Sequence, residues 1–195
     1  MPQTAHSPQH SASAPALALT IAGSEATGGA GAQADLKTFQ ELGVFGIVAL
    51  TCIVSFDPED DWNHRFFPVP TEILQQQLDA IQGDYPERLR TVKLGMQGSP
   101  EVIRTSAAAL RRAEWDHVVL DPVLICKGQE PGHALDTDQA LKAELLPLAT
   151  FTTPNHFETE QLSGMTVRSV EDLTAAARRI HEISGAAVLA TAAPL

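Results

Sequence analysis

A glycine-rich segment between a short apolar run and a helical pattern is the clearest candidate for chemistry in this sequence. Residues 23–31 read GSEATGGAG, and glycines let a backbone approach a ligand closely. Unpaired amides at the start of the following helix favour an anionic or polar ligand. The segment from Gly29 matches the dinucleotide-binding pattern G-x-G-x-x-A, but no convincing acidic residue ends the second strand at the usual distance. The segment is not a Walker A loop, because no Gly-Lys-Ser/Thr follows. A glycine turn that binds no ligand is the alternative.

Two acidic residues lie where parallel sheets place their ligands, beyond the carboxyl ends of strands. Asp35 falls in the first turns of the helix after the glycine segment, and Asp121 directly follows a buried apolar run. An aspartate in the position of Asp121 can hold Mg²⁺ through water. Each also has a structural interpretation. Asp35 would stabilise the helix dipole, and Asp121 with Pro122 would begin a turn.

Two further segments combine polar groups that suit either structure or chemistry. Asn155 and Glu158 have the spacing of a helix capping box, and the same amide and carboxylate would suit a phosphate-and-metal site. Cys126 and Lys127 lie in a long loop, residues 121–136, whose Pro and Gly content is typical of a lid. An unreactive thiol and a solvated charge are the alternatives there. The histidines, including His64 in a polar connection, lack metal-ligand spacing.

Short apolar segments alternate with helical patterns from residue 16 onward, and this alternation predicts the elements that must position these residues. Strands alternating with helices indicate βαβ units with right-handed crossovers, hence an α/β fold whose mainly parallel sheet is flanked by helices. Strands are expected at residues 16–22, 46–54, 91–94, 117–120, 150–152 and 186–190. Helices are expected at residues 30–42, 71–81, 100–112, 137–145, 155–163 and 170–184.

Capping signals and apolar spacing add detail to these helices. Thr71, Ser99 and Ser169 are expected N-caps, with Pro100 at a first helical position and Asp172 as the capping-box partner of Ser169. The apolar spacing predicts which side chains face the core. They are Ala34, Leu36, Phe39 and Leu42 in one helix and Ile73, Leu74, Leu78 and Ile81 in the next.

The composition excludes several classes of function. The 195 residues carry 13 Lys and Arg against 24 Asp and Glu, a net charge of −11 that argues against nucleic-acid or anionic-membrane binding. No apolar run reaches the roughly 18 residues of a membrane span. Two cysteines are too few for a disulfide framework, so a cytoplasmic, reducing location is expected. Residues 1–15 lack Asp, Glu, Lys and Arg and are expected to be a flexible tail before a domain at 16–195.

These segments, taken in their order along the chain, resemble one family. Residues 18–39, ALTIAGSEATGGAGAQADLKTF, are similar to the opening signature of bacterial hydroxymethylpyrimidine and phosphomethylpyrimidine kinases, of the ribokinase-like superfamily. Residues 49–70, ALTCIVSFDPEDDWNHRFFPVP, are more similar to the branch that also phosphorylates pyridoxal and pyridoxine. KLGM, VVLDPVLICKG and TPNHFETEQLSG follow in the family's order. The resemblance covers about residues 16–190 and implies a ribokinase-like fold.

This resemblance also implies a substrate pocket. The vitamer ring would lie against Gly23 and Gly29 of the glycine turn, Asp35 would hydrogen-bond its polar edge, and Met96 would line the same pocket. Phe56 occupies a position where the pyrimidine-specific enzymes typically carry Gln and the pyridoxal-capable branch often carries Met. An apolar residue there removes an amide that reads the aminopyrimidine and supplies a face for stacking or packing.

The same resemblance implies an enzyme that uses ATP as the phosphoryl donor, with Mg²⁺. Asp121 and Glu158 would organise Mg²⁺ and its waters, and Asn155 would contact an ATP phosphate. Cys126 and Lys127 would belong to a lid over the reacting hydroxymethyl group. The expected partner is a small-molecule vitamer rather than a nucleic acid or a membrane, and a homodimer is expected because the family often forms dimers.

The family pattern continues after the last expected strand with a Gly-Gly strand end, further strands and a turn that activates the substrate hydroxyl. Here Thr191-Ala192-Ala193 stands instead and the sequence stops at Leu195. The resemblance therefore implies an incomplete ribokinase-like domain with no catalytic residue present and little turnover. Two functions stay open. One is phosphorylation of hydroxymethylpyrimidine (or its phosphate) or of pyridoxal or pyridoxine, in thiamine or vitamin B6 metabolism. The other is a non-catalytic vitamer-binding remnant or an unstable fragment. A dinucleotide-dependent oxidoreductase is a distant third.

Overall fold

The computed structural model describes residues 14–124 and 131–191, and for residues 131–135 it describes the backbone alone. Seven strands in the described ranges form one sheet in the order β3-β2-β1-β4-β5-β6-β7, and every neighbouring pair is parallel except β2 with β3. The α/β fold with a mainly parallel sheet is therefore confirmed. The strands are β1 (Leu17–Glu25), β2 (Phe45–Asp57), β3 (Asn63–Pro68), β4 (Thr91–Leu94), β5 (His117–Leu120), β6 (Phe151–Thr152) and β7 (Ala187–Val188).

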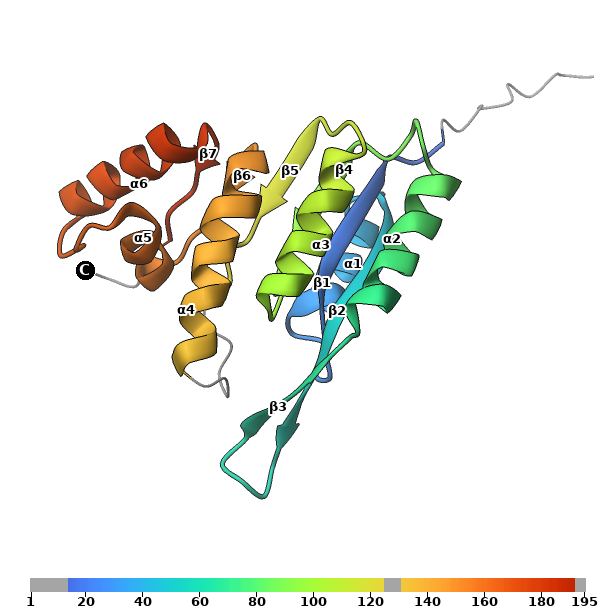
Figure 1. Cartoon of the computed structure of the whole chain (residues 1–195), viewed down its shortest axis with the longest axis horizontal. Helices are drawn as coiled ribbons and strands as arrows, with labels where there is room; N and C mark the ends of the chain where they lie inside the picture. The colour runs from blue at the N-terminus through green and yellow to red at the C-terminus, as the bar shows by residue number, and fades with distance from the viewer. Residues whose placement is uncertain (1–13, 125–130, 192–195) are drawn as a thin grey trace, which may run out of the picture.

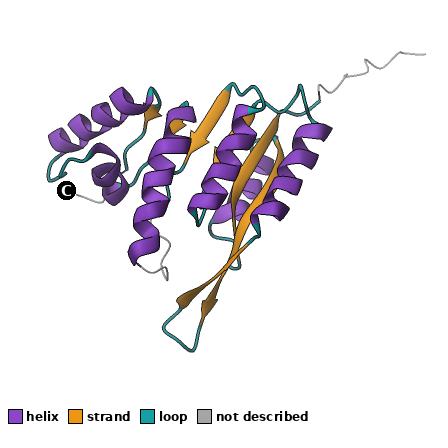
Figure 2. Cartoon of the chain, in the orientation of Figure 1, coloured by secondary structure: helices purple, strands orange, loops and turns teal. Residues whose placement is uncertain are grey.

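Helices cover both faces of this sheet (Figures 1 and 2). α1 lies on one face, while α2 and α3 pack side by side on the other. A short π-helical segment (Leu141–Leu145) and a 3₁₀ turn (Leu146–Leu148) continue α4. None of the described helices is long and apolar enough to cross a membrane. The helices are α1 (Gly31–Glu41), α2 (Thr71–Asp84), α3 (Pro100–Arg111), α4 (Pro131–Ala140), α5 (His156–Ser163) and α6 (Val170–Ser184).

The core lies between the sheet and the helices on its two faces. Because parallel strands with helices on both sides are buried on both faces, their side chains are apolar at nearly every position. Leu19 and Ile21 of β1 are fully buried, and the same holds for Leu94 of β4 and Leu120 of β5. The side chains that α2, α3 and α6 bring against the sheet include Leu74, Leu78, Ile103 and Ile180.

The strand order reverses at β1, and this reversal determines where a site can form. The chain passes from β1 to β2 on one side and later returns to β4 on the other. Connections that leave in opposite directions open a crevice beyond the carboxyl ends of the two central strands. The glycine segment follows β1, and the KLGM segment, residues 93–96, includes the end of β4. Both segments therefore border this crevice.

Several element boundaries match the sequence expectations. β4 and β5 occupy the expected residues, and Ser99 accepts a hydrogen bond from Val102 N–H, with Pro100 as the first helical residue. Ser169 likewise accepts from Asp172 N–H. The carboxylate of Asp172, however, accepts from Arg168 N–H, one residue ahead of the position expected in a capping box.

Other expectations at the helix ends were wrong. Thr71 is not the N-cap of α2, because the amides of the first turn donate to the carbonyl of Pro70, which makes Thr71 the first helical residue. Ile73 is 44% exposed because it points away from the sheet, and Leu42 is 73% exposed because it caps α1 beyond its last turn. Leu36 is 36% exposed, but its Cδ2 packs against Gly46 of β2, so its expected apolar contact is confirmed. The helix expected at residues 137–145 begins earlier, at Pro131, and widens into the π-helical segment from residue 141.

The main element that the sequence did not reveal is β3. It pairs antiparallel with β2 and forms a hairpin that extends away from the sheet (Figure 1). His64 and Phe66 point to one face of this hairpin and Arg65 and Phe67 to the other, so no continuous apolar run marks the strand. The segment expected to be a polar connection is thus an edge strand, and it carries His64 to the crevice.

The flexible tail expected at residues 1–15 lies almost entirely outside the described residues, which begin at residue 14. Cys126 and Lys127, the lid candidates, also lie outside the described residues. Their proposed role therefore stays a prediction.

Candidate active site

A cavity of about 420 Å³ opens at the carboxyl ends of β1 and β4. Its walls come from the glycine turn, the β2–β3 hairpin and the residues that end or follow β4 and β5. Five of the residues expected to bind substrate or metal line it together, namely Gly23, Gly29, Phe56, Met96 and Asp121. Other lining residues, among them Glu25, Thr27, His64 and Lys93, had no role assigned from the sequence.

The glycine turn is closed by its own side chains. Gly31 pairs with Ser24 across the turn at a φ of +61°, and a Cβ added to Gly31 would overlap the carbonyl oxygen of Gly23. The carboxylate of Glu25 accepts the N–H of Gly29 at 2.9 Å and further hydrogen bonds from the same turn. Glu25 therefore takes the amides of the turn itself, Thr27, Gly29 and Ala30, whereas the helix that follows from Gly31 receives no side-chain cap at Ala30. The expected anion contact at the helix start stays a prediction.

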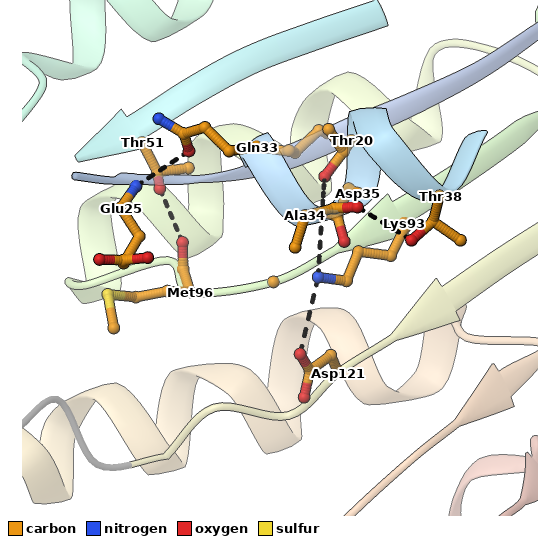
Figure 3. A network of polar contacts seen from close by, with 12 residues as sticks. Thr20, Glu25, Gln33, Ala34, Asp35, Thr38, Thr51, Lys93, Met96 and Asp121 are labelled. Carbon is orange, nitrogen blue, oxygen red and sulfur yellow. Dashed lines mark hydrogen bonds and ion pairs between the residues drawn. The ribbon is translucent and has the colours of Figure 1, made fainter. Parts of the chain in front are cut away.

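Gln33 holds this turn to the end of β1 (Figure 3). Its Oε1 accepts from Glu25 N–H at 3.0 Å, and its Nε2 donates to Ser24 Oγ at 2.6 Å. The side chain comes from α1, so the helix and the strand fix the turn between them. The sequence contains no signal for this contact, because a single Gln in a helix does not indicate its partner.

One wall of the cavity is aromatic. Phe56 of β2 and His64 of β3 are cross-strand neighbours whose ring centroids lie 4.8 Å apart at an interplanar angle of 80°. This edge-to-face arrangement is a favourable one for aromatic pairs. Val54, two residues before Phe56, lines the same wall. The hairpin therefore offers the cavity apolar side chains together with one imidazole.

Met96 lines the cavity beside Gly23, and the buried Cys52 packs behind both residues without lining the cavity. Cys52 Sγ lies 3.6 Å from Met96 Sδ, and Thr51 Oγ1 donates to the carbonyl of Met96 at 2.6 Å. A Cβ added to Gly23 would lie 2.6 Å from Cys52 Sγ, so only glycine leaves room there. Burial raises the pKa of the Cys52 thiol. The thiol therefore stays protonated at neutral pH and acts as apolar packing.

Lys93 connects two of the expected acidic residues (Figure 3). Its Nζ lies 3.1 Å from Asp35 Oδ2 and 3.6 Å from Asp121 Oδ2. Asp35 Oδ2 also accepts from Thr20 Oγ1 at 2.6 Å. Asp35 does not line the cavity, because these contacts hold it beside β1, so its hydrogen bond to a vitamer stays a prediction. Sequence reasoning missed Lys93 because its two partners come from distant segments.

Asn155 and Glu158 form the capping box that their spacing predicts. Asn155 Oδ1 accepts from Glu158 N–H at 2.9 Å, and Glu158 Oε2 accepts from Asn155 N–H at 2.9 Å. Glu158 is 7% exposed. The predicted capping box is thus confirmed. The phosphate-and-metal site stays open as well, because each carboxylate or amide oxygen has further lone pairs.

The charge of Asp121, which lines the cavity, acts on Glu158, which does not line it. Burial raises the pKa of Asp121, and the positive charge of Lys93 partly offsets this rise. Burial also raises the pKa of Glu158, to which the Asp121 charge adds. Mg²⁺ is usually held by one or two carboxylates together with substrate phosphates and waters, so this pair fits the ion. No cluster of three or more His, Cys, Asp or Glu suited to a metal occurs among the described residues.

Comparisons with known proteins agree with this architecture. A family model described as phosphomethylpyrimidine kinase matches residues 25–195. The chain is 45% identical over 179 residues to a pyridoxine kinase of Bacillus subtilis, covering 89% of this chain and 64% of that protein. It is 41% identical over 156 residues to a hydroxymethylpyrimidine/phosphomethylpyrimidine kinase of Haemophilus influenzae, covering 80% and 56%.

Solved structures show the same fold. An ADP complex of Bacillus subtilis pyridoxal kinase aligns with a TM-score of 0.84 at 44% identity, over 92% of this chain and 67% of that chain. The pyridoxal kinase of Staphylococcus aureus in complex with AMP-PCP and pyridoxal aligns with a TM-score of 0.76 at 40% identity, over 88% and 60%. The chain spans about three fifths of the length of the curated relatives it matches.

Proposed function

The chain belongs to the phosphomethylpyrimidine kinase family, of ribokinase-like fold, and from that membership we propose that its cavity binds a vitamer whose hydroxymethyl group receives a phosphoryl group from ATP. The observation that carries the proposal is the cavity itself. It joins an apolar aromatic wall, Phe56 with His64, to the acidic residue Asp121 at the crevice where α/β sheets bind ligands. A flat heteroaromatic ring suits the wall, and a reacting hydroxymethyl group suits the acidic side.

The proposed ring site lies between the glycine turn and the hairpin. Gly23 and Gly29 let the backbone approach one face of the ring, and Phe56 and Met96 pack around the other. The cavity volume of about 420 Å³ is in the range of small-molecule sites. The Staphylococcus aureus relative has been solved with pyridoxal, which supports a pyridine vitamer as the ligand here.

The proposed phosphate side is at Asp121, Glu158 and Asn155. Asp121 and Glu158 would hold Mg²⁺, which when bound supplies charge neutralisation at the ATP phosphates, and Asn155 would donate to a phosphate oxygen. Relatives solved with ADP and AMP-PCP support ATP as the phosphoryl donor. Lys93 keeps Asp121 in place by its charge at 3.6 Å. Phosphoryl transfer depends mostly on such positioning and charge stabilisation.

Titration and turnover measured together test this function. Isothermal titration of the 195-residue chain with pyridoxal and with hydroxymethylpyrimidine should show saturable binding, with benzyl alcohol as a control that lacks the ring heteroatoms. ADP formation with each vitamer measures turnover. Binding with ADP formation supports the kinase, and binding without it supports the non-catalytic alternative. The absence of vitamer binding contradicts the proposed function. The low turnover and the homodimer implied by the resemblance stay predictions, measured by this assay and by light scattering.

Phe56→Gln is expected to move the preference from pyridoxal toward hydroxymethylpyrimidine. Phe56 gives the wall no group that reads an aminopyrimidine, whereas Gln supplies one and is penalised when it stays unpaired. The ratio of the two dissociation constants should change by about tenfold, since one hydrogen bond of about 1.4 kcal/mol gives that factor. Ile53→Gln, at an exposed position of the same strand outside the cavity lining, is the matched control. An unchanged ratio for Phe56→Gln would refute the role of this residue.

Asn155→Asp separates the proposed phosphate contact from the N-cap. Asp caps a helix as well as Asn does, so the free energy of unfolding should change by less than about 0.5 kcal/mol, whereas Asn155→Ala should lose about 1 kcal/mol. The added charge should weaken ATP binding by about tenfold or more because it repels the phosphates. Urea unfolding and ATP titration measure the two effects. Equal ATP affinity in the native chain and both variants would argue against the contact.

A further inference from the structure

The carboxylate of Glu25 is enclosed by the glycine turn that it begins. Its Oε1 accepts from Thr27 N–H at 2.7 Å. Its Oε2 accepts from Thr27 Oγ1 at 2.8 Å, from Gly29 N–H at 2.9 Å and from Ala30 N–H at 3.3 Å. The residue is 9% exposed. Four donors of one short turn therefore converge on a single side chain from the same turn.

This arrangement is that of an anion-binding turn whose anion belongs to the protein. Consecutive amides of glycine-rich turns before a helix commonly bind the phosphate of a ligand. Here the donors are already satisfied, and their hydrogen bonds lower the pKa of Glu25, with Thr27 N–H as the largest cause. The carboxylate is therefore ionised at neutral pH. A phosphate would have to displace it in order to use the same amides.

The side-chain length is what allows Glu25 to reach these donors. Oε2 contacts amides four and five residues further along the chain, and Gln33 holds the backbone N–H of Glu25 from the opposite side. An aspartate has one methylene fewer, so in this backbone conformation its carboxylate would lie farther from Gly29 and Ala30 than that of Glu25 does. The closed turn thus depends on glutamate and its length.

We propose that Glu25 is a positioning residue that holds the glycine turn in its ring-binding shape before the vitamer arrives and keeps phosphate out of the turn. Thr27, Gly29, Ala30 and Gly31 of this turn all line the cavity, so a fixed turn is a preformed wall. Preformed walls strengthen binding because the ligand does not have to order them. Only the part of this inference that concerns vitamer binding rests on the proposed function.

Removal of the carboxylate should loosen the turn and weaken the binding of the vitamer. Glu25→Ala leaves the three amides without an acceptor, so the ligand must order their backbone when it binds. The entropy cost of ordering three residues should weaken the binding of pyridoxal by about tenfold or more. The vacated donors then form a small anion site. Formate, which has the size and charge of the missing group, should restore both the closed turn and the affinity.

Amide hydrogen exchange and calorimetry test this on the 195-residue chain. Without vitamer, the amides of Thr27, Gly29 and Ala30 should be protected in the native chain and unprotected in Glu25→Ala. Formate should restore their protection, while the same concentration of chloride should not. Pyridoxal titrations should follow the same pattern. Glu25→Asp should give amide protection and pyridoxal affinity between those of the native chain and Glu25→Ala. Glu41→Ala, which changes an exposed residue at the end of α1, should match the native chain in both.

Two results would overturn the inference. One is native protection and native pyridoxal affinity in Glu25→Ala. The other is a loss of both that formate leaves unrepaired in a variant with native thermal unfolding. If Glu25→Ala does not fold, Glu25→Gln keeps the side-chain volume with one acceptor oxygen, and unaltered protection in Glu25→Gln would refute the requirement for the carboxylate. If the native chain binds no pyridoxal, the proposed function fails, while the exchange measurement still decides the role of Glu25.

Discussion

Gly31→Ala should lower the free energy of unfolding by about 2–5 kcal/mol, because it combines backbone strain with a steric overlap. Gly31 has a φ of +61°, which L-residues with a side chain rarely adopt. A Cβ there would overlap the carbonyl oxygen of Gly23. That oxygen belongs to the backbone of β1, so it cannot turn aside as a flexible side chain would. Urea unfolding of the native chain and the variant measures the loss.

Gly43→Ala is the matched control for this prediction. Gly43 has a φ of +71°, but an added Cβ meets nothing within 4 Å, so only the backbone strain of about 1–2 kcal/mol applies. The difference between the two variants then isolates the overlap with Gly23. Pyridoxal binding should survive in Gly43→Ala and be lost in Gly31→Ala even where the chain is still folded. Equal losses of stability in the two variants would contradict this account of the turn.

The fold was predictable where a local signal matched a local cause. Ser99 and Ser169 cap helices because their hydroxyls reach an amide three residues on, and β4 and β5 are buried apolar runs. β3 was missed because each of its faces mixes polar and apolar residues, His64 with Phe66 on one and Arg65 with the exposed Phe67 on the other, so the strand lacks the regular alternation of a half-buried strand. Thr71 was mistaken for an N-cap because the preceding proline already supplies the carbonyl that the first turn uses.

The site was predictable in position and less so in its contacts. Gly23, Phe56, Met96 and Asp121 line one cavity because the carboxyl ends of parallel strands meet at one edge of the sheet. Lys93 could not be identified, since its ion pairs bring together β4, α1 and the segment after β5. Those contacts hold Asp35 outside the cavity lining.

Glu25 shows a second limit of reasoning from sequence. In the sequence, Glu25 is one residue of a glycine-rich segment to which no role was assigned, and the amides of that segment look like a site for an external anion. The structure reverses this interpretation, because the acid and the amides bind each other. A hydrogen-bond pattern within five residues decides what the turn can bind, and residue types alone do not contain that geometry.

Met96→Trp should abolish vitamer binding or weaken it by more than about tenfold, because the indole would occupy the space proposed for the ring. Met96 lines the cavity between Gly23 and the hairpin, so added volume there points into the site. Met165→Trp makes the same substitution beyond the end of α5, at a residue that does not line this cavity. Its affinity for pyridoxal should equal that of the native chain. Thermal unfolding of both variants verifies that each is folded.

The most direct measurement is a calorimetric titration of pyridoxal into the native chain, Met96→Trp and Met165→Trp. The account predicts saturable binding by the native chain and by Met165→Trp, and its loss in Met96→Trp. Equal binding by all three would place the vitamer elsewhere. Binding of MgATP by a native chain that shows no binding of pyridoxal would contradict the assignment of this cavity to the vitamer.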